Sequence, residues 1–289
     1  MWAIYAILSA IFIATTDPVA KRALKASDEY VVGWLLLVFS LTFLGAYSFL
    51  NPAVRITPAL LRMLAFAMPF EIIATVLYYK ALKLTDISLS VPFLALTPVF
   101  AILTAFLLLG ERIRPSVALG IGLVTIGAYS LNLREVKHGF VSPVKAIFLN
   151  KGSLYMVIVS LIFSITASIS KKVMLASNAC SAPFIYNASI SVSMLPIIAY
   201  RLSRQKTSFA RIPDSIILYV ILGSSLAASS IFFFKAVSLA NVAYAVAIKR
   251  LSLVLSVLYG WIFFKERDIH LRLASTLCMF IGIVLVLIG

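Results

Sequence analysis

Two adjacent cations, Lys249 and Arg250, interrupt an otherwise apolar run that extends from about Asn241 to Phe264. A helix formed by this run would be roughly 36 Å long, which is enough to cross a hydrocarbon layer of about 30 Å. Lys249 would then lie near the bilayer midplane, where each charge costs on the order of 2.5–3.5 kcal/mol. Such a pair is tolerated where it faces protein, water or an anion. We therefore interpret it as a substrate or coupling site, with a structural buried ion pair as the alternative.

Two acidic residues are expected at a comparable depth in other apolar runs. Glu71 lies in the middle of its run, and Asp17 lies just before Pro18 towards the end of the first run. If these acids pair with Lys249 and Arg250, the cavity is neutral, and a carboxylate that loads and releases a proton could act as a coupling switch. If the cations face the cavity alone, they select an anion, because a guanidinium offers a bidentate fork and an ammonium adds a point charge.

Small and polar residues accompany the cations on one helical face, at the spacing that places Ala245, Lys249, Ser252 and Ser256 in a stripe. Such a stripe is suited to lining a cavity, and we choose Ser252, Tyr79 and Tyr244 as further substrate-binding residues. Ordinary helix packing or an interfacial aromatic belt is the alternative for each of the polar and aromatic candidates, which are Tyr78, Tyr79, Thr97, Ser164, Ser168, Ser229 and Tyr244.

The composition indicates the class of protein that must hold these residues. Hydrophobic residues make up 62% of the chain and charged residues 12%, and the mean hydropathy is +1.07. This balance is typical of a polytopic membrane protein and excludes a soluble domain. The net charge of +15 arises mostly from basic residues at helix ends, where they contact anionic headgroups, so nucleic acid is not an expected partner.

The fold class predicted is an all-α polytopic membrane protein with ten transmembrane helices. No segment alternates like a strand of a membrane barrel. Pro92 and Pro98 should break the fourth helix and free the carbonyls of Ser88 and Leu94, because each proline lacks a backbone donor. The ten helices are expected at about 2–24, 30–50, 60–83, 86–109, 114–133, 153–175, 181–202, 214–239, 241–264 and 270–288.

The chain repeats itself with an offset of 155 residues. Residues 1–133 and 153–289 each hold five predicted helices, and the polar stretch 134–152 connects them. Because five is odd, the second copy must enter the membrane from the opposite side. This is an inverted-topology repeat, whose binding site is expected between the repeats near mid-membrane. The matching pairs are Lys80-Ala81 with Lys235-Ala236, Glu111-Arg112 with Glu266-Arg267, and Ile126-Gly127 with Ile281-Gly282.

With its duplicated glutamate after the fourth helix of each half, in GER at 110–112 and KER at 265–267, the chain resembles the drug/metabolite transporter superfamily, and the EamA type in particular. The resemblance covers essentially the whole chain. It implies two EamA-like repeats that form a secondary transporter working by alternating access without ATP hydrolysis. Glu111 and Glu266 themselves are expected to cap the next helix or to pair locally.

The Lys-Arg pair also resembles that of the plastid sugar-phosphate translocators, in which such a dipeptide in the ninth helix holds the substrate phosphate. By this resemblance, Lys249 and Arg250 would hold an anionic group. Those translocators use a further lysine from the fourth helix, and segment 86–109 contains none. We therefore expect recognition of a carboxylate or another small organic anion.

The resulting functional hypothesis is a secondary carrier for a small organic anion or zwitterionic metabolite, with Lys249 and Arg250 as ligands and Glu71 as partner or proton site. The alternative is a proton-coupled exporter of amphipathic or cationic compounds or amino acids that uses Glu71 and Asp17. An enzyme is not expected, because neither an HExxH nor a GxSxG motif is present. Cys180, Cys278, His138 and His270 show no disulfide or metal pattern, and no cofactor is predicted.

We expect a multi-pass protein of the plasma membrane whose partners are a small-molecule metabolite and the lipid bilayer, and a homodimer is left open. The orientation is also left open. A cytoplasmic amino terminus, as the resemblance implies, would place most basic residues on the far side, whereas the positive-inside rule favours the reverse.

Overall fold

The computed structural model describes residues 1–25, 27–50, 56–85, 87–130, 150–204, 216–255, 259 and 269–288. These residues form helices and turns without a β-strand. Among them, six helices are long and apolar enough to cross a membrane, and three apolar helices are shorter. The prediction of an all-helical membrane protein is therefore confirmed. The six long helices span Trp2–Ala23, Glu29–Phe49, Pro58–Leu84, Lys151–Ala176, Ala182–Ser203 and Ile216–Leu239.

Helix boundaries follow the local chemistry of the chain. Asp28 caps α3 by accepting hydrogen bonds from Tyr30 N and Val31 N, and Asn150 caps α9 in the same way. Gly110 ends α6 with a φ of 69°, a left-handed conformation that glycine adopts without strain. In chain order the elements are α1 (Trp2–Ala14), α2 (Thr16–Ala23), α3 (Glu29–Phe49), α4 (Pro58–Leu84), α5 (Ile87–Ser90), the 3-10 helix η1 (Val91–Leu96), α6 (Thr97–Leu109), α7 (Pro115–Ser130), α9 (Lys151–Ala176), α10 (Ala182–Ser203), α11 (Ile216–Leu239), α12 (Val242–Lys249) and α14 (Ile269–Ile288).

Two of the predicted helices are interrupted by proline. The first breaks into α1 and α2 at Thr15, three residues before Pro18, whose ring has no N–H to offer the carbonyl of Ala14. The fourth consists of α5, η1 and α6, and Thr97 Oγ1 donates to the carbonyl oxygen of Leu94 over 2.7 Å. This is the carbonyl that Pro98 leaves without its helical donor, so the expected break is confirmed at this point.

The ninth predicted helix differs from the expectation of one continuous span. α12 ends at Lys249, and Arg250 lies in a turn. The carbonyl oxygen of Arg250 accepts a hydrogen bond from Leu253 N over 3.0 Å, and residues 251–255 are helical again. The interruption therefore falls on the cation pair. The residues of this run from Ser256 onward, apart from Tyr259, lie outside the described residues, as do most of the connecting stretch 134–152 and Glu266.

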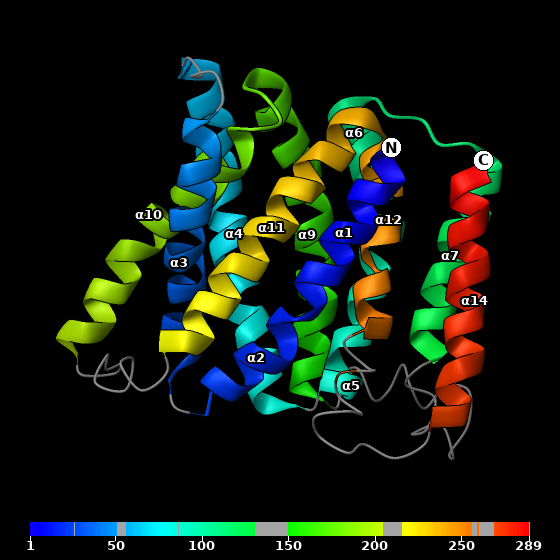
Figure 1. The fold of residues 1–289 in the computed structure, drawn as a ribbon, viewed down its shortest axis with the longest axis horizontal. Helices are drawn as coiled ribbons and strands as arrows, with labels where there is room; N and C mark the ends of the chain where they lie inside the picture. The colour runs from blue at the N-terminus through cyan, green and yellow to red at the C-terminus, as the bar shows by residue number, and fades with distance from the viewer. Residues whose placement is uncertain are drawn as a thin grey trace.

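The boundaries of the two halves repeat with the predicted offset. α4 and α11 end at Leu84 and Leu239, and the next helices begin at Ile87 and Val242, in both cases 155 residues apart. Lys21 Nζ donates to the carbonyl of Thr85, and Gly152 also lies against Thr85. The end of α2 and the start of α9 thus meet at one end of the bundle, so these two helices, each the first of its half, run in opposite directions. Both chain termini lie at the other end (Figure 1).

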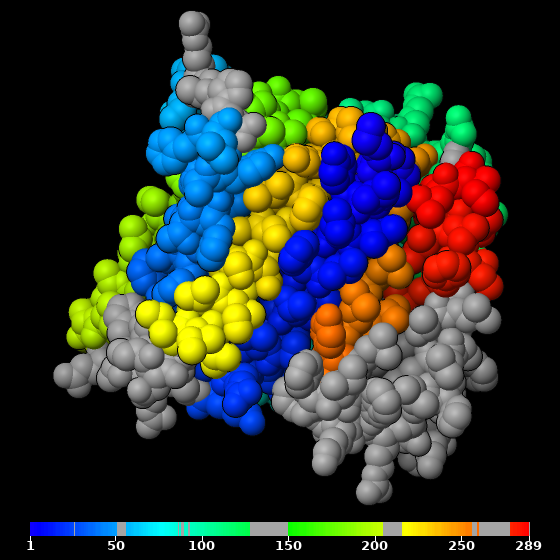
Figure 2. Space-filling view, in the orientation of Figure 1, coloured from blue at the N-terminus to red at the C-terminus, as the bar shows by residue number. Residues whose placement is uncertain are grey.

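The halves are interleaved. α1 packs along α11, with α12 beside it, as the space-filling view shows (Figure 2), and α4 packs along α9. α7 and α14 form a closely packed pair at one edge of the molecule (Figure 1), where a Cβ added to Gly120 would lie 2.7 Å from the carbonyl oxygen of Gly282. Helices can approach this closely in a membrane where glycines remove the side chain from the contact.

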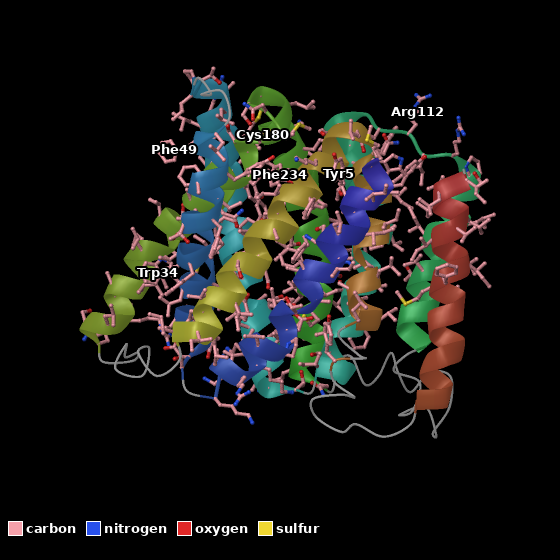
Figure 3. The ribbon with its side chains drawn as sticks, in the orientation of Figure 1. Tyr5, Trp34, Phe49, Arg112, Cys180 and Phe234 are labelled. Carbon is pink, nitrogen blue, oxygen red and sulfur yellow. The ribbon has the colours of Figure 1, made fainter. Side chains whose placement is uncertain are left out.

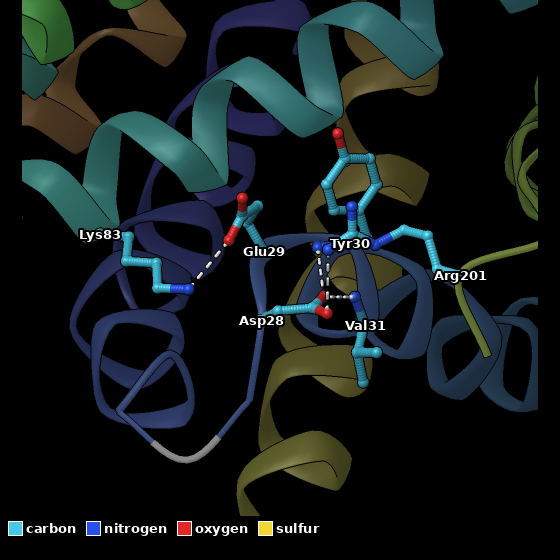
Figure 4. Close-up of polar contacts among 6 residues, drawn as sticks. All are labelled: Asp28, Glu29, Tyr30, Val31, Lys83 and Arg201. Carbon is cyan, nitrogen blue, oxygen red and sulfur yellow. Dashed lines mark hydrogen bonds and ion pairs between the residues drawn. The ribbon is translucent and has the colours of Figure 1, made fainter. Parts of the chain in front are cut away.

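Ion pairs and a cation–π contact join α3 to neighbouring helices at the end of the bundle opposite the termini. Arg201 pairs with Asp28 at 3.4 Å and lies 3.9 Å from the centre of the Tyr30 ring, and Lys83 pairs with Glu29 at 3.0 Å (Figure 4). Farther along α3, the indole of Trp34 donates to the carbonyl of Ser191 on α10 (Figure 3). These contacts join helices of both halves around the cavity described next.

Candidate functional site

A cavity of about 240 Å³ lies between the two halves, and its walls come from α1 and α2, α3, α4, η1, the start of α6, α9, α10, α11, α12 and the residues that follow α12. Six of the seven residues predicted for the site line this cavity. Tyr244 does not, because its ring packs on Trp2, with ring centroids 6.1 Å apart. The six cavity-lining residues are Asp17, Glu71, Tyr79, Lys249, Arg250 and Ser252.

Arg250 is held in place by the broken fourth helix. Its side chain is buried, with 8% of the residue exposed, and Nη2 donates to Thr97 Oγ1 over 2.7 Å. The proton of this hydroxyl already goes to the carbonyl of Leu94, so Thr97 has a lone pair free to accept the guanidinium. Among the described residues, Nε of Arg250 has no hydrogen-bond partner. An unmade hydrogen bond of this kind costs about 1–3 kcal/mol.

Lys249 meets an aromatic ring. Its Nζ lies 4.4 Å from the centre of the Phe233 ring on α11, within the range of a cation–π interaction. In the described part of the chain, no carboxylate lies within ion-pair distance of Lys249. The ring partly offsets the cost of burying the ammonium.

The two acids are each hydrogen-bonded by a tyrosine. Tyr186 OH on α10 donates to Glu71 Oε1 over 2.7 Å, and Tyr78 OH donates to Asp17 Oδ1. Asp17 also sits in the first turn of α2, where the helix dipole favours a negative charge. In this conformation, neither Lys249 nor Arg250 forms an ion pair with Glu71. Tyrosine hydroxyls stabilise the acids without cancelling the charge of the cations.

Sequence analysis did not identify Phe233, Tyr186 or Asn187, which also line the cavity. Tyr186 and Asn187 form a polar pair inside the apolar run of α10, which is the one sequence signal that points to them. Other candidates serve packing: Ser229 exchanges hydrogen bonds with Ser9 on α1, and Thr104 donates to the carbonyl of Ser164.

The start of α12, and with it the cation pair, is positioned by Glu111. The Oε2 atom of Glu111 accepts Val242 N over 2.8 Å, so the carboxylate caps α12 from the turn between α6 and α7. Glu111 thus caps a helix, but the expectation that it caps the next helix or pairs locally is wrong, because both α12 and its ion-pair partner Lys171 belong to the other half. The neighbouring Arg112 points away from the bundle (Figure 3).

Comparisons with known proteins agree with this architecture. A solved crystal structure aligns with 98% of this chain and 95% of its own length at a TM-score of 0.71 and 17% sequence identity, which shows a shared fold. Comparison with curated protein sequences finds no match. The sequence profile of the EamA-like transporter family matches residues 1–133 and again residues 150–288, so each half is one copy of the family's repeat. The chain therefore belongs to the EamA-like transporter family and is a multi-pass membrane transporter.

Proposed function

We propose that this protein is a secondary transporter that carries a small organic anion or zwitterionic metabolite across the membrane, with Lys249 and Arg250 as ligands of the anionic group. One observation carries the proposal. Arg250 is buried between the two halves, lines the cavity, and keeps an unsatisfied Nε donor among the described residues. Ser252 and Tyr79 line the same cavity and are the proposed neutral contacts.

Alternating access is the mechanism that this arrangement supports best. The first helices of the two halves run in opposite directions, and the helix boundaries repeat with one offset, as in an inverted repeat of five helices each. The interruption at η1 faces the interruption at Arg250 through the contact to Thr97. Broken helices of this kind place backbone and side-chain donors at mid-membrane, and ten crossings in the plasma membrane complete the proposal.

Counterflow in proteoliposomes tests the proposal. Vesicles loaded with an unlabelled organic anion should accumulate the labelled anion, and Lys249→Ala should abolish this accumulation. Lys80→Ala is a matched control, because Lys80 lies near the end of α4, outside the cavity, over the ring of Tyr155. Counterflow that survives Lys249→Ala unchanged would remove the anion site from this position.

The second candidate is a proton-coupled exporter of amphipathic or cationic compounds or amino acids. The pairs Glu71–Tyr186 and Asp17–Tyr78 favour it, because each places a hydrogen-bonded carboxylate at the cavity. A carboxylate that leaves its tyrosine partner could bind a proton in one state and an amine in another, and this alternation would couple the proton flux to the amine flux. An imposed proton gradient should then drive uptake of a labelled amine that Glu71→Gln abolishes, whereas the anion carrier requires no such gradient.

A further inference from the structure

We infer that the anionic group of the substrate is a carboxylate attached to an apolar body, and that a phosphate on a polar body is not the substrate. The inference rests on the proposed anion site at Lys249 and Arg250. It is carried by three features of the cavity: the donors that remain on Arg250, the balance of charges around the cavity, and the chemistry of its walls.

The guanidinium of Arg250 presents one edge for a planar anion. Nη2 uses one N–H for Thr97, and Nε has no partner among the described residues. Nε–H lies on the edge of the guanidinium that it shares with one N–H of Nη2, and the geometry of this edge matches the two oxygens of one carboxylate. Arg201 provides the contrast, because its buried Nε belongs to a guanidinium that already has Asp28 as a carboxylate partner.

The charges around the cavity suit a monoanion. Among the described residues that line it, the charged ones are Asp17, Glu71, Lys249 and Arg250, two of each sign. A phosphate monoester brings a charge of about −1.5 to −2 at neutral pH and would leave a marked negative excess beside two carboxylates. A carboxylate adds one negative charge and so leaves a smaller excess, and it can contact the ammonium of Lys249, which forms no ion pair with the described residues.

The walls suit an apolar body. Phe163, Phe233 and Phe234 line the cavity together with Leu36 and Leu37. Several neutral polar side chains line it as well, but the hydroxyls of the two tyrosines beside the acids, and those of Thr16 and Ser170, already donate within the protein. A polyhydroxylated body would bury several hydroxyl groups against aliphatic and aromatic carbon, and each unsatisfied hydroxyl costs about 1–3 kcal/mol. An aromatic or aliphatic body in the same place would bury its apolar surface away from water, and this burial would contribute favourable free energy to binding.

Four ligands, three of which share one phenylethyl body, separate the contributions of the charge, the anionic group and the body in a binding experiment on the detergent-purified protein. They are 3-phenylpropanoate, its neutral amide 3-phenylpropanamide, the isosteric 2-phenylethylphosphonate, and gluconate, which has a carboxylate on a polyhydroxylated body. We expect 3-phenylpropanoate to bind at least about tenfold more tightly than each of the other three. Equal or tighter binding of the phosphonate or of gluconate would overturn the inference.

Two arginine variants test whether the preference for the carboxylate depends on Arg250. Arg250→Lys keeps the charge and removes the guanidinium edge, so the preference for the carboxylate over the amide should fall about tenfold or more. Arg201→Lys makes the same change outside the cavity and should keep the wild-type preference. Thermal unfolding of both variants shows that the folded protein is being measured.

The same ligands distinguish failure of this inference from failure of the proposed function. If the phosphonate binds in an Arg250-dependent manner and exchanges in proteoliposomes, the anion carrier stands and the carboxylate class is wrong. If none of the three anions binds or exchanges while a proton gradient drives uptake of a labelled amine, the anion carrier itself is wrong and the inference is overturned with it.

Discussion

Lys171 and Glu111 form an ion pair of 2.6 Å between the end of α9 and the turn that follows α6. Lys171 Nζ also donates to the carbonyl of Ala240 over 2.7 Å, and the second oxygen of Glu111 caps α12 at Val242. The pair therefore closes the bundle at the end that carries the termini. It also fixes the start of the helix that ends in the two cations.

Loss of this pair should destabilise the protein more than loss of an exposed pair. Both side chains are largely covered, at 13% and 11% exposure, and removing one partner of a buried pair costs about 3–5 kcal/mol. Lys171→Met should therefore lower the thermal unfolding midpoint markedly. Lys83→Met is the matched control, because Lys83 is 44% exposed in its pair with Glu29 and such pairs contribute roughly 0–1 kcal/mol.

Glu111 allows a finer separation of the two roles. Glu111→Gln keeps an oxygen that can accept Val242 N and loses only the ion pair, whereas Glu111→Ala loses the cap as well. We expect the unfolding midpoint to fall in the order wild type, Glu111→Gln, Glu111→Ala. Equal midpoints for the two variants would contradict the capping role, which is expected to contribute about 0.5–2 kcal/mol.

The contact between α7 and α14 should tolerate no added methyl group at Gly120. A Cβ there would lie 2.7 Å from the backbone oxygen of Gly282, so the helices would have to separate. Overpacking of this kind costs about 1–3 kcal/mol. Gly122 is two residues away on the same helix and has no atom within 4 Å of its added Cβ. Gly120→Ala should lower the unfolding midpoint, and Gly122→Ala should leave it unchanged or raise it.

Thr97 should act on binding through Arg250. Thr97→Val is nearly isosteric but removes the oxygen that accepts Nη2 and the hydroxyl that satisfies Leu94, whereas Thr97→Ser keeps both. We expect Thr97→Val to weaken binding of 3-phenylpropanoate about tenfold, because the guanidinium loses its orientation. Thr97→Ser should bind within about twofold of wild type, and a comparable loss in both variants would show that the hydroxyl is not what matters.

Tyr186 should matter only if Glu71 takes part in transport. Tyr186→Phe removes the donor to Glu71 Oε1 and keeps the ring that packs on Phe234, 6.0 Å between centroids. In the anion carrier, initial rates of counterflow should change by no more than about threefold. In the proton-coupled alternative, the dependence of amine uptake on external pH should shift, which a series of uptake assays over pH 5.5–8.5 measures.

Sequence periodicity located much of this fold because membrane helices are long and apolar. Pro98 marked a real interruption, since a missing N–H acts locally whatever the tertiary packing, whereas the break before Pro18 falls in a helix that is expected to be continuous over 2–24. The position of Lys249 and Arg250 at the cavity also followed from depth alone, because buried charge in a membrane has few tolerated places.

The partners of these residues could not be found in this way. Thr97 meets Arg250 across more than a hundred residues, and Phe233 meets Lys249 from another helix. Such contacts depend on how helices cross. The repeat does not reveal Tyr186, which aligns with Val31 at the offset of 155, although it aligns Phe233 with Tyr78, another residue of the cavity. Tyr244 is predicted to line the cavity, but its side chain leaves α12 towards Trp2.

An experimental structure with a bound heavy-atom ligand tests the central claim most directly. In crystals grown with 3-(4-bromophenyl)propanoate, we predict that the carboxylate lies within hydrogen-bond distance of Arg250 and next to Lys249, with anomalous signal from bromine among the phenylalanine rings. A bromine peak outside the cavity, or Lys249 and Arg250 paired with Asp17 and Glu71 beside an empty cavity, would contradict the account.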